Sequence, residues 1–464
     1  MTDKPHVPDP AHGSHCSGCG PRTFSSAQSN RRRMALSRRA FLHRALAAGL
    51  VTAGGAAVAG CGLGGLGSSS PGAATGPATS GSTRRGVNLD TAPESTGRLL
   101  SDAVDGRVLV IVDLFGGNDG LSTLVPYGTG RYYDLRPDLA IPEDRVLTVD
   151  ETVGLHPSLA RLHRRGVLAV EGVGPINGDL SHFDMAARWQ RGDVDGENAH
   201  LRTGFLARLV DAVNDGSPLV GVSTTGSSPY LANAAGATLS LSDSNDLWML
   251  REDGWDEMRV FREQLAAFAP GPVADGYARL IDLAERLDTD GEELDWEQPM
   301  IAQGGDLGHQ LYLAAELIAA DVGTRVVYAG TGDYDTHVDH LWRHTDNLAQ
   351  VDAAVDGFLT RADELGFADR VVVATVSEFG RRVPENGSGL DHGSASTMLI
   401  AGASTETGVT GLVGERPSLG ELDEDDNLRT TIGFDRYLAS LAQEWLGVEA
   451  ASVLAGAPEP LGLF

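Results

Sequence analysis

The stretch VVVATVSEFGRRVPENGSGLDHGSAS, from Val371 to Ser396, decides the predicted fold. It begins with an apolar run rich in β-branched residues, which is typical of a strand buried on both faces of a sheet. The run ends at Glu378, and the loop after it reaches Asp391 and His392. A buried strand that ends in a carboxylate and is followed by an Asp-His pair indicates a ligand-binding loop at the sheet edge.

Two other apolar runs end in the same way. Arg107–Val112 is followed by Asp113, and Arg325–Ala329 is followed by a loop that holds Asp335 and His337. Weaker strand candidates are residues 167–173 and 219–222, and apolar spacing predicts helices at 310–320, 341–365 and 435–446. Strands that alternate with helices predict an α/β fold with a mainly parallel central sheet and helices on both faces.

The polar residues after these strands predict a metal site. Because the carboxyl ends of parallel strands share one edge of a sheet, we expect five side chains to meet there. These are Asp113, Asp335, His337, Glu378 and His392. Crowded carboxylates repel one another, and a divalent cation relieves that repulsion. Oxygen and imidazole ligands suit zinc, manganese, magnesium or calcium, so the identity of the ion stays open.

Four more residues of the same loops are further candidates, namely Asn118, Asp119, Asp333 and Asp391. Asp, Asn and Gly also end strands for local reasons, because their side chains and backbones favour turns and caps. For Asn118 and Asp119 by themselves, a turn or cap is the preferred interpretation.

The charge of the chain argues against nucleic acid as a partner. The formal net charge of all 464 residues is −28, whereas the first sixty residues carry +6, so the remaining residues carry −34. A body this acidic is repelled by the phosphate backbone of nucleic acids. Hydrophobic content of 41% and charged content of 22% are typical of a globular protein.

The N-terminal segment resembles an export signal. Residues 31–61 join a basic stretch to a short Gly/Ala-rich apolar run, which is too short to be a convincing membrane span. Within it, SRRAFL (residues 37–42) resembles a twin-arginine export signal, and VAGC, ending at Cys61, resembles a lipoprotein cleavage box. We therefore expect the twin-arginine machinery as a partner, and either secretion or attachment to the outer face of the cytoplasmic membrane through a lipidated Cys61.

The domain organisation follows from this. Residues 1–61 are the expected signal, residues 62–85 form a Gly/Ser/Pro-rich tether, and residues 86–464 form the folded domain. Residues 245–297 are acidic and helical in pattern, which suggests a small helical cap inserted in that domain. Cys16 and Cys19 have metal-knuckle spacing, but one such pair cannot complete a four-ligand zinc site.

Six motifs carry a resemblance to a known family. They are IVDLFGGNDGLSTLVPYG, GLHPSL, SHFDMAARWQRG, GDYDTH, SEFGRRVPENGSGLDHG and TTIGFDRYLASLAQEWLG, in this order between Arg107 and Gly447. Together they resemble the family called domain of unknown function 1501. That family is grouped with the alkaline phosphatase-like and sulfatase-like hydrolases. The resemblance therefore implies a sandwich of helices around a central sheet. On this fold we expect a metal-dependent hydrolase of phosphate-type or, less expected, sulfate esters.

The resemblance also implies a nucleophile. The superfamily order is an aspartate, a Ser/Thr at a helix start, an Asp/His pair, a second acidic strand end and a final histidine. It is similar to the order Asp113, Ser181, Asp335 with His337, Glu378 and His392 in this chain. Ser181 precedes His182, and it also fits a plain helix N-cap with Asp184 near the capping-box position. Nucleophile and cap both stay open for Ser181, and ligand and packed loop residue both stay open for His182.

Two arginines are further candidates, and the chain differs from the superfamily pattern in two places. Arg381 and Arg382 could clamp an anionic ester, because a guanidinium matches phosphate oxygens in pairs, or they could be solvated loop residues. Glu378-Phe379 stands where related phosphatases have Asp-His, which favours one metal or an oxygen-rich second site. The Cys/Ser-x-Pro-Ser-Arg motif of formylglycine sulfatases is absent. The alternative function is a non-catalytic, surface-tethered binding or structural protein on a hydrolase scaffold.

Overall fold

The structure, a computed structural model, describes residues 106–226, 228–241, 260, 264, 297–403, 405 and 408–464. All of them belong to one unit of the chain, Ala47–Phe464. The expected signal, the tether and nearly all of the expected cap at 245–297 lie outside the described residues. No helix within the described ranges combines the length and the apolar character that crossing a membrane requires.

The described strands form a nine-stranded sheet in the order β11-β5-β10-β9-β1-β8-β6-β7, with β12 also paired to β5. Its strands are β1 (Val108–Leu114), β5 (Leu168–Gly174), β6 (Gly221–Ser223), β7 (Thr238–Ser240), β8 (Val326–Thr331), β9 (Val371–Val376), β10 (Ser396–Gly402), β11 (Gly411–Val413) and β12 (Ile432–Gly433). All pairs are parallel except those that β10 makes with β5 and β9. The predicted α/β fold with a mainly parallel sheet is confirmed.

The central strand β1 shows why helices must cover both faces of this sheet. Every residue of β1 is buried, and its side chains alternate between two hydrophobic clusters. Leu109 and Ile111 belong to one cluster, while Val108, Val110 and Val112 belong to the other. A strand with apolar side chains on both faces is stable only when helices cover both faces, because each exposed apolar side chain would cost free energy in water.

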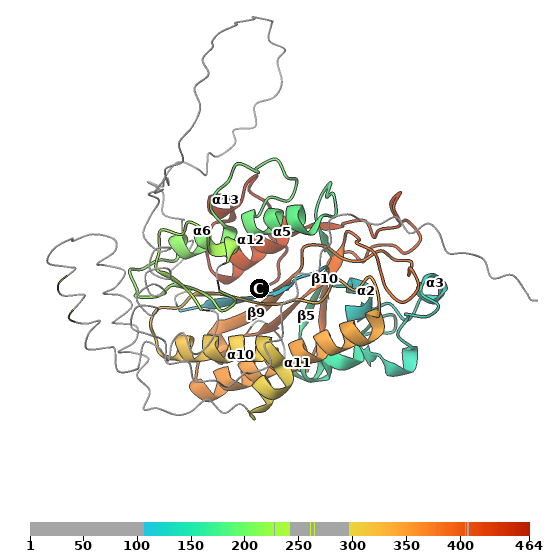
Figure 1. Cartoon of the computed structure of the whole chain (residues 1–464), viewed down its shortest axis with the longest axis horizontal. Helices are drawn as coiled ribbons and strands as arrows, with labels where there is room; N and C mark the ends of the chain where they lie inside the picture. The colour runs from blue at the N-terminus through green and yellow to red at the C-terminus, as the bar shows by residue number, and fades with distance from the viewer. Residues whose placement is uncertain are drawn as a thin grey trace, which may run out of the picture. The chain divides into compact units, whose positions relative to one another are not determined.

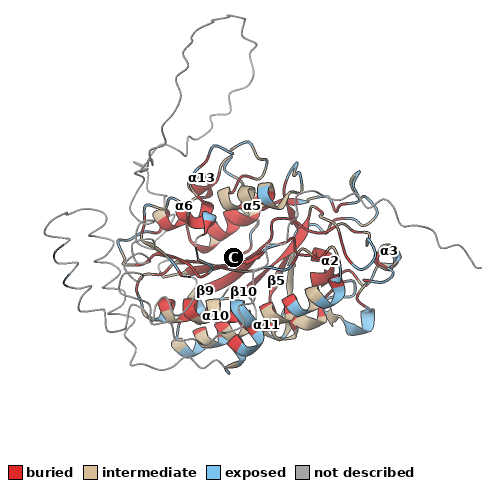
Figure 2. Cartoon of the chain, viewed as in Figure 1, coloured by how far each residue is buried: buried red, intermediate tan, exposed pale blue. Residues whose placement is uncertain are grey.

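Helices pack on the two faces of the sheet (Figure 1). One layer holds α5 (His182–Arg191), α6 (Phe205–Ala212), α12 (Phe434–Ala439) and α13 (Ala450–Val453), and the other holds α10 (Pro299–Ala319) and α11 (His340–Leu365). The burial colours show the sheet as the most deeply buried layer, with exposed residues on the outer helix surfaces (Figure 2). The described chain therefore has the helix–sheet–helix layering that the alternating pattern predicted.

Smaller elements connect these layers. They are α2 (Gly120–Thr123), α3 (Gly130–Leu135), α4 (Ala160–Arg165) and a second sheet in the order β2-β4-β3, made of β2 (Leu124–Val125), β3 (Leu147–Thr148) and β4 (Gly154–Leu155). The helix expected at 435–446 is split into α12 and a π-helical segment, Ser440–Trp445. Strand β10 was not predicted, although its residues are as buried as those of β9.

Candidate metal centre

Four segments far apart in the sequence meet at one edge of the sheet. Three are the loops that follow β1, β8 and β9, and the fourth is the start of α5. Strands β8 and β9 flank β1 in parallel, with Asp113 level with Gly330 and Val376, so these strands end at the same height. The common edge that the sequence predicted is therefore formed by three adjacent strands.

Glycine allows these loops to approach closely. Gly116, just after β1, has a φ of +118°, and a Cβ there would lie 2.4 Å from the backbone nitrogen of Asp335. A Cβ at Gly389 would lie 2.1 Å from the carbonyl carbon of His337. At both positions any side chain would push the loop that carries Asp335 and His337 away from its neighbours.

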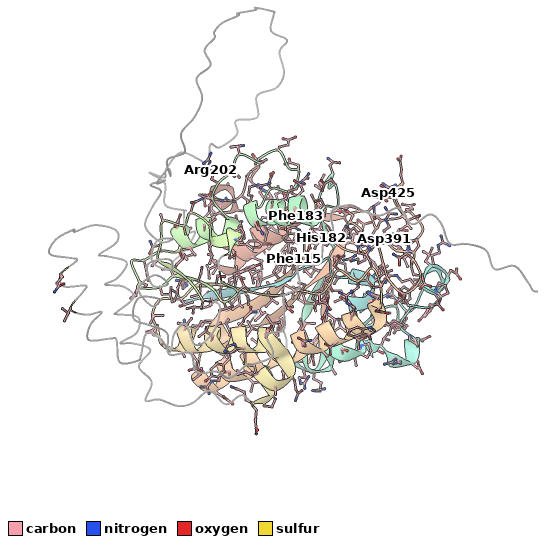
Figure 3. All side chains as sticks on the ribbon, viewed as in Figure 1. Phe115, His182, Phe183, Arg202, Asp391 and Asp425 are labelled. Atoms are coloured by element: carbon pink, nitrogen blue, oxygen red, sulfur yellow. The ribbon has the colours of Figure 1, made fainter. Side chains whose placement is uncertain are left out.

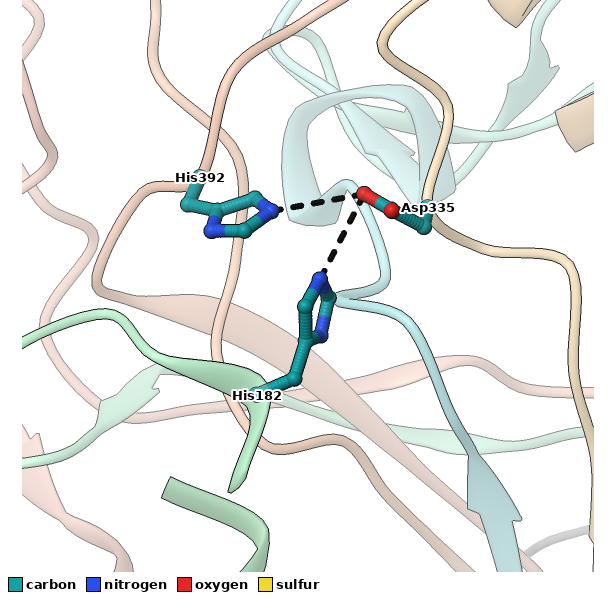
Figure 4. Close-up of side chains that lie close together, drawn as sticks. All are labelled: His182, Asp335 and His392. Carbon is teal, nitrogen blue, oxygen red and sulfur yellow. Dashed lines mark hydrogen bonds and ion pairs between the residues drawn. The ribbon is translucent and has the colours of Figure 1, made fainter. Parts of the chain in front are cut away.

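The centre of the site is Oδ1 of Asp335 (Figure 4). Three imidazoles point an Nε2 atom at this oxygen, with distances of 3.1 Å from His337, 3.3 Å from His392 and 3.5 Å from His182. The guanidinium of Arg381 adds a fourth contact at 2.8 Å. One carboxylate oxygen is thus surrounded by four nitrogen-bearing side chains from three different segments.

The opposite ring nitrogens determine how these histidines are oriented. Nδ1 of His182 lies 2.8 Å from Oε1 of Glu378, and Nδ1 of His337 lies 3.0 Å from Oδ1 of Asp391. Nδ1 of His392 lies 2.8 Å from the carbonyl oxygen of Leu180. Carbonyl and ionised carboxylate oxygens accept but cannot donate, so each ring carries its proton on Nδ1. When Nε2 is unprotonated, as metal binding requires, its lone pair faces the centre of the site.

This arrangement fits a metal ion. One ligand atom each from His182, Asp335 and His392 lies within 4.8 Å of the other two, so the three could hold an ion together. Nε2 of His182 is buried and has no hydrogen-bond partner. Metal-binding histidines in proteins commonly donate their other N–H to a carboxylate or a backbone carbonyl, as these three do. Three protein ligands with an open position are typical of catalytic rather than structural zinc sites.

The negative charge of Asp335 and the positive charges around it shift one another's pKa values. Burial raises the pKa of Asp335, but the imidazoles and the Arg381 guanidinium outweigh it and hold that pKa well below its usual range. Burial disfavours the charged ring of His182, but its contacts with Asp335 and Glu378 outweigh this effect and raise its pKa to about 9. The contact with Asp335 likewise raises the pKa of His337. Positive charge is therefore strongly favoured at the centre of the site.

Glu378 and Asp113 lie behind the three ligands rather than among them. Oε1 of Glu378 accepts a hydrogen bond from the backbone N–H of Gly116 at 2.8 Å and supports His182. Asp113 accepts a hydrogen bond from the hydroxyl of Tyr328 at 2.9 Å. Burial and the nearby Glu378 raise the pKa of Asp113 to about 7. Of the five expected ligands, the structure brings Asp335, His337 and His392 together directly, and it connects Glu378 through His182.

Arg381 differs from the anion clamp that we expected. Its side chain is 1% exposed, because the guanidinium points inward and holds the loops together. It donates to the carbonyl oxygens of Gly116, Gly117, Tyr334 and Leu390 and to Asp335. With these acceptors in place, little of the guanidinium is left to bind a substrate.

Arg382 has the opposite orientation. Its side chain is 36% exposed and makes one long ion pair of 3.9 Å with Asp425. A guanidinium in this position is accessible to an anion, whereas that of Arg381 is not.

Ser181 lies between two residues that belong to the site. It occupies the N-cap position of α5, as predicted, but its side chain makes no capping hydrogen bond. Asp184 pairs with Arg188 at 2.7 Å and does not form a capping box. Leu180 has a φ of +57°, which is rare for a leucine, and its carbonyl oxygen accepts from His392. The start of α5 is thus positioned by contacts with the cluster, and the helix does not use the Ser181 hydroxyl.

The remaining candidates have structural partners. Asp119 is the N-cap of α2 and forms a buried ion pair with Arg136 at 2.6 Å. Asn118 is fully buried and its Oδ1 lies 3.0 Å from Nε2 of His344. Asp333 is exposed and pairs with Arg343. The turn and cap interpretation of Asn118 and Asp119 therefore agrees with their positions.

The sequence left the role of His182 open, whereas the structure places this residue among the candidate ligands. Its Nε2 completes the ligand set, while its Nδ1 connects the set to Glu378. The only sequence signal was its position directly after an expected helix start, where a side chain at N1 can face the carboxyl edge of a sheet. A lone histidine at that position is equally compatible with packing, so the signal did not separate the two roles.

Comparison with known proteins gives one strong match and several distant ones. The family model described as "Protein of unknown function (DUF1501)" matches residues 107–431. No curated protein sequence matches the chain.

Among solved structures, the chain is similar to the lipoteichoic acid synthase LtaP from Listeria monocytogenes, with 8% identity, a TM-score of 0.36 and coverage of 79% of this chain and 78% of that one. It is also similar to a phosphonate monoester hydrolase from Silicibacter pomeroyi, with 10% identity, a TM-score of 0.37 and coverage of 74% of each chain. A third similar structure is a protein in the alkaline phosphatase superfamily from Vibrio parahaemolyticus, with 10% identity, a TM-score of 0.34 and coverage of 76% of this chain and 67% of that one. Likeness at this level says nothing about activity.

Proposed function

The chain belongs to the DUF1501 family of proteins of unknown function, and we propose that it is a metal-dependent hydrolase of phosphate-type esters. The observation that carries this proposal is the set of three imidazoles whose Nε2 atoms converge on Oδ1 of Asp335. Each ring is held from behind through Nδ1, so the ligand set is oriented before any ion binds. Zinc, manganese, magnesium and calcium are the candidate ions.

Three protein ligands would leave a coordination position of the ion open to a substrate or a water. A bound divalent ion would supply Lewis acidity, which polarises an ester and lowers the pKa of a nearby hydroxyl or water. Asp335, His182 and His392 would hold the ion, and the Nδ1 partners would keep the rings in place. His337 would be a fourth ligand or would orient Asp335, which it contacts at 3.1 Å.

Ser181 is the nucleophile that we propose. Its neighbours on both sides are tied to the site, since Leu180 accepts from His392 and His182 contacts Asp335. A serine at a helix N-terminus beside a cation is easier to deprotonate, because both favour the alkoxide. Arg382 is the accessible guanidinium of this loop and would be the one to hold an anionic oxygen.

The test uses the purified full chain. We would measure its metal content and its turnover of 4-nitrophenyl phosphate, bis(4-nitrophenyl) phosphate and 4-nitrophenyl sulfate. We expect Asp335→Asn and His392→Asn to lose both bound metal and activity. We expect Ser181→Ala to keep the metal and lose activity by on the order of 10⁶-fold, as removal of a serine nucleophile does.

The control is His163→Asn. His163 is a half-buried histidine of α4 whose Nε2 contacts the carbonyl oxygen of Thr148 at 3.0 Å, away from the cluster. It should keep both metal and activity. A chain that binds metal and turns over none of the three esters would contradict the hydrolase and favour a binding protein. Activity that survives both Ser181→Ala and Asp335→Asn would contradict the site.

We also propose that the protein works outside the cytoplasm, attached through a lipidated Cys61 or secreted. The support is the SRRAFL motif at residues 37–42 and the VAGC box that ends at Cys61. Replacing Arg38 and Arg39 by lysine should leave the chain in the cytoplasm. Cys61→Ala should release an exported chain from the membrane fraction. Unchanged fractionation of both variants would contradict this proposal.

A further inference from the structure

Several exposed apolar residues lie in the segments that carry the metal ligands. The large hydrophobic residues that are exposed within the described part of the chain are Phe115, Ile176, Phe183, Val260, Val338, Leu341, Trp342, Val409 and Phe464. Phe183 follows His182 directly, and Val338 follows His337 directly. Phe115 precedes Gly116, whose N–H binds Glu378. Single exposed apolar residues are ordinary on a protein surface, but a group of them around one site is not.

We call Phe115, Phe183, Val338, Leu341 and Trp342 the apolar rim. The first part of this rim is aromatic. Phe183 is 84% exposed in the first turn of α5, and Phe115 is 47% exposed at the end of β1 (Figure 3). The ring of Phe115 lies 5.9 Å from the ring of His182. On the buried side, Phe379 lies 4.9 Å from the same ring and 4.8 Å from that of His392. The ligand set is therefore bordered by aromatic surface on both its buried and its exposed side.

The second part is the start of α11. Val338, Leu341 and Trp342 are 57%, 42% and 64% exposed. On the same helix His340 and His344, one turn apart, are each 1% exposed and face the interior. Trp342 lies about 200° around the helix from His340 and so points away from the core, whereas Leu341 lies at the border of the buried face. Val338, two residues before α11, and Leu341 and Trp342 in its first turn thus present three apolar residues to the solvent.

We infer that the substrate is an amphiphilic ester, in which an anionic phosphate-type group carries an alkyl or aryl chain. This inference rests on the proposed function and names its substrate class. The anionic group would bind at the metal centre, and the apolar chain would lie against Phe115 and Phe183 and the Val338–Trp342 segment. Burial of the chain against these side chains would supply binding free energy that a small hydrophilic ester lacks.

The position of the rim favours a substrate chain over a folded partner. Phe183 and Val338 are bonded through the backbone to His182 and His337, so a protein seated on them would block access to the ligand atoms. A flexible chain attached to the reacting ester leaves the ligand atoms open to that ester. The apolar rim and the ligand set also share one ring contact, that between Phe115 and His182.

The experiment compares two diesters with the same leaving group, methyl 4-nitrophenyl phosphate and octyl 4-nitrophenyl phosphate, below the micelle concentration of the latter. For the metal-loaded full chain we expect kcat/KM to be about tenfold higher for the octyl ester, since its longer chain buries more apolar surface. Phe115→Ser combined with Phe183→Ser should reduce this preference to about twofold or less. Trp342→Ser is a second variant that tests the α11 side separately.

The control is Val409→Ser, which removes an exposed apolar residue next to Gly408, whose N–H donates to the carbonyl oxygen of Arg165 at the end of α4. It should keep the octyl preference. Equal kcat/KM for the two esters in the wild-type chain would overturn the inference while leaving the hydrolase standing. A preference that persists in both aromatic and Trp342 variants would overturn it as well.

A binding measurement separates this inference from the proposed function. If neither diester is hydrolysed, titration of the metal-loaded chain with octyl phosphate and methyl phosphate still reports on the rim. If octyl phosphate binds about tenfold tighter than methyl phosphate and the double variant loses this difference, the inference is supported even though no hydrolase activity is found. Equal affinities overturn it. A concentration-dependent dimer that dissociates in the double variant would assign the rim to a second copy of the chain, and would also overturn it.

Discussion

The Nε2 atoms of His337 and His392 lie 3.0 Å apart, and both face Oδ1 of Asp335. Both rings have their Nδ1 occupied by an oxygen acceptor, so their Nε2 atoms are the groups left to respond to a change in the site. Two protonated Nε2 atoms at this separation would repel each other. A divalent cation resolves the conflict, because it accepts lone pairs from both nitrogens at once.

Metal binding should release protons. The pKa of His182 is raised to about 9, and that of His337 is also raised, so both rings favour the protonated form at pH 7. A metal needs the unprotonated nitrogen, so zinc binding at pH 7 should release about one to two protons and tighten as pH rises towards 9. Calorimetric titration in two buffers of different ionisation enthalpy measures this number. Binding without proton release would contradict the assigned ligands, and His182→Asn should lower the count.

Arg381 and Arg382 should differ sharply in their effect on stability. The guanidinium of Arg381 is buried and donates to four carbonyl groups and to Asp335, and Arg381→Lys would leave several of these acceptors unpaired. We expect a loss of about 3–5 kcal/mol in the free energy of unfolding, as for other disrupted buried pairs. The matched change Arg382→Lys should cost less than about 1 kcal/mol, because this side chain is partly solvated. Urea denaturation of both variants decides this, and similar losses would contradict the structural role of Arg381.

Gly116→Ala should damage the site through the backbone. The new Cβ would lie 2.4 Å from the nitrogen of Asp335, at a φ of +118° that alanine rarely adopts. We expect a loss of stability of about 1–3 kcal/mol and weaker metal binding, since Asp335 would have to move. The control is Gly332→Ala in the loop after β8, where a Cβ would meet no atom within 4 Å. Equal metal affinity in the two variants would show that Gly116 does not position Asp335.

Asp113 should make the metal-free protein less stable as pH rises. Its pKa is raised from 3.8 to about 7 in the folded chain, mainly by burial, so the folded state binds more protons than the unfolded state between these values. Stability should therefore fall from about pH 4 to about pH 7 and stay level above, with at most about 4 kcal/mol from this group. Asp113→Asn removes the carboxyl and should flatten that slope.

The check is the free energy of unfolding at several pH values in the presence of a chelator. The control Asp134→Asn changes an exposed aspartate of α3 and should leave the slope as it is in the wild-type chain. A slope that is unchanged in Asp113→Asn would mean that this carboxyl keeps an ordinary pKa in the folded protein.

The apolar pattern of the chain was enough to predict the sheet and the edge at which the site lies. The runs that form β1, β8 and β9 are apolar and β-branched, and such runs have few stable places other than a sheet covered on both faces. Once they are parallel neighbours, their carboxyl ends meet, and Asp335, His337 and His392 follow those ends. Strand β10 escaped prediction because its direction depends on its pairing with β9 and β5, which local pattern does not encode.

The roles of the residues within the site depend on contacts that form only in the folded chain. His182 and Glu378 are separated by 196 residues, and their contact is what orients the His182 ring. Adjacent arginines, 381 and 382, have identical chemistry, yet one points into a frame of carbonyl oxygens and the other towards solvent. The physical reason is that a side chain's direction and protonation depend on partners from distant segments. Those partners come within range only when the whole sheet edge has assembled.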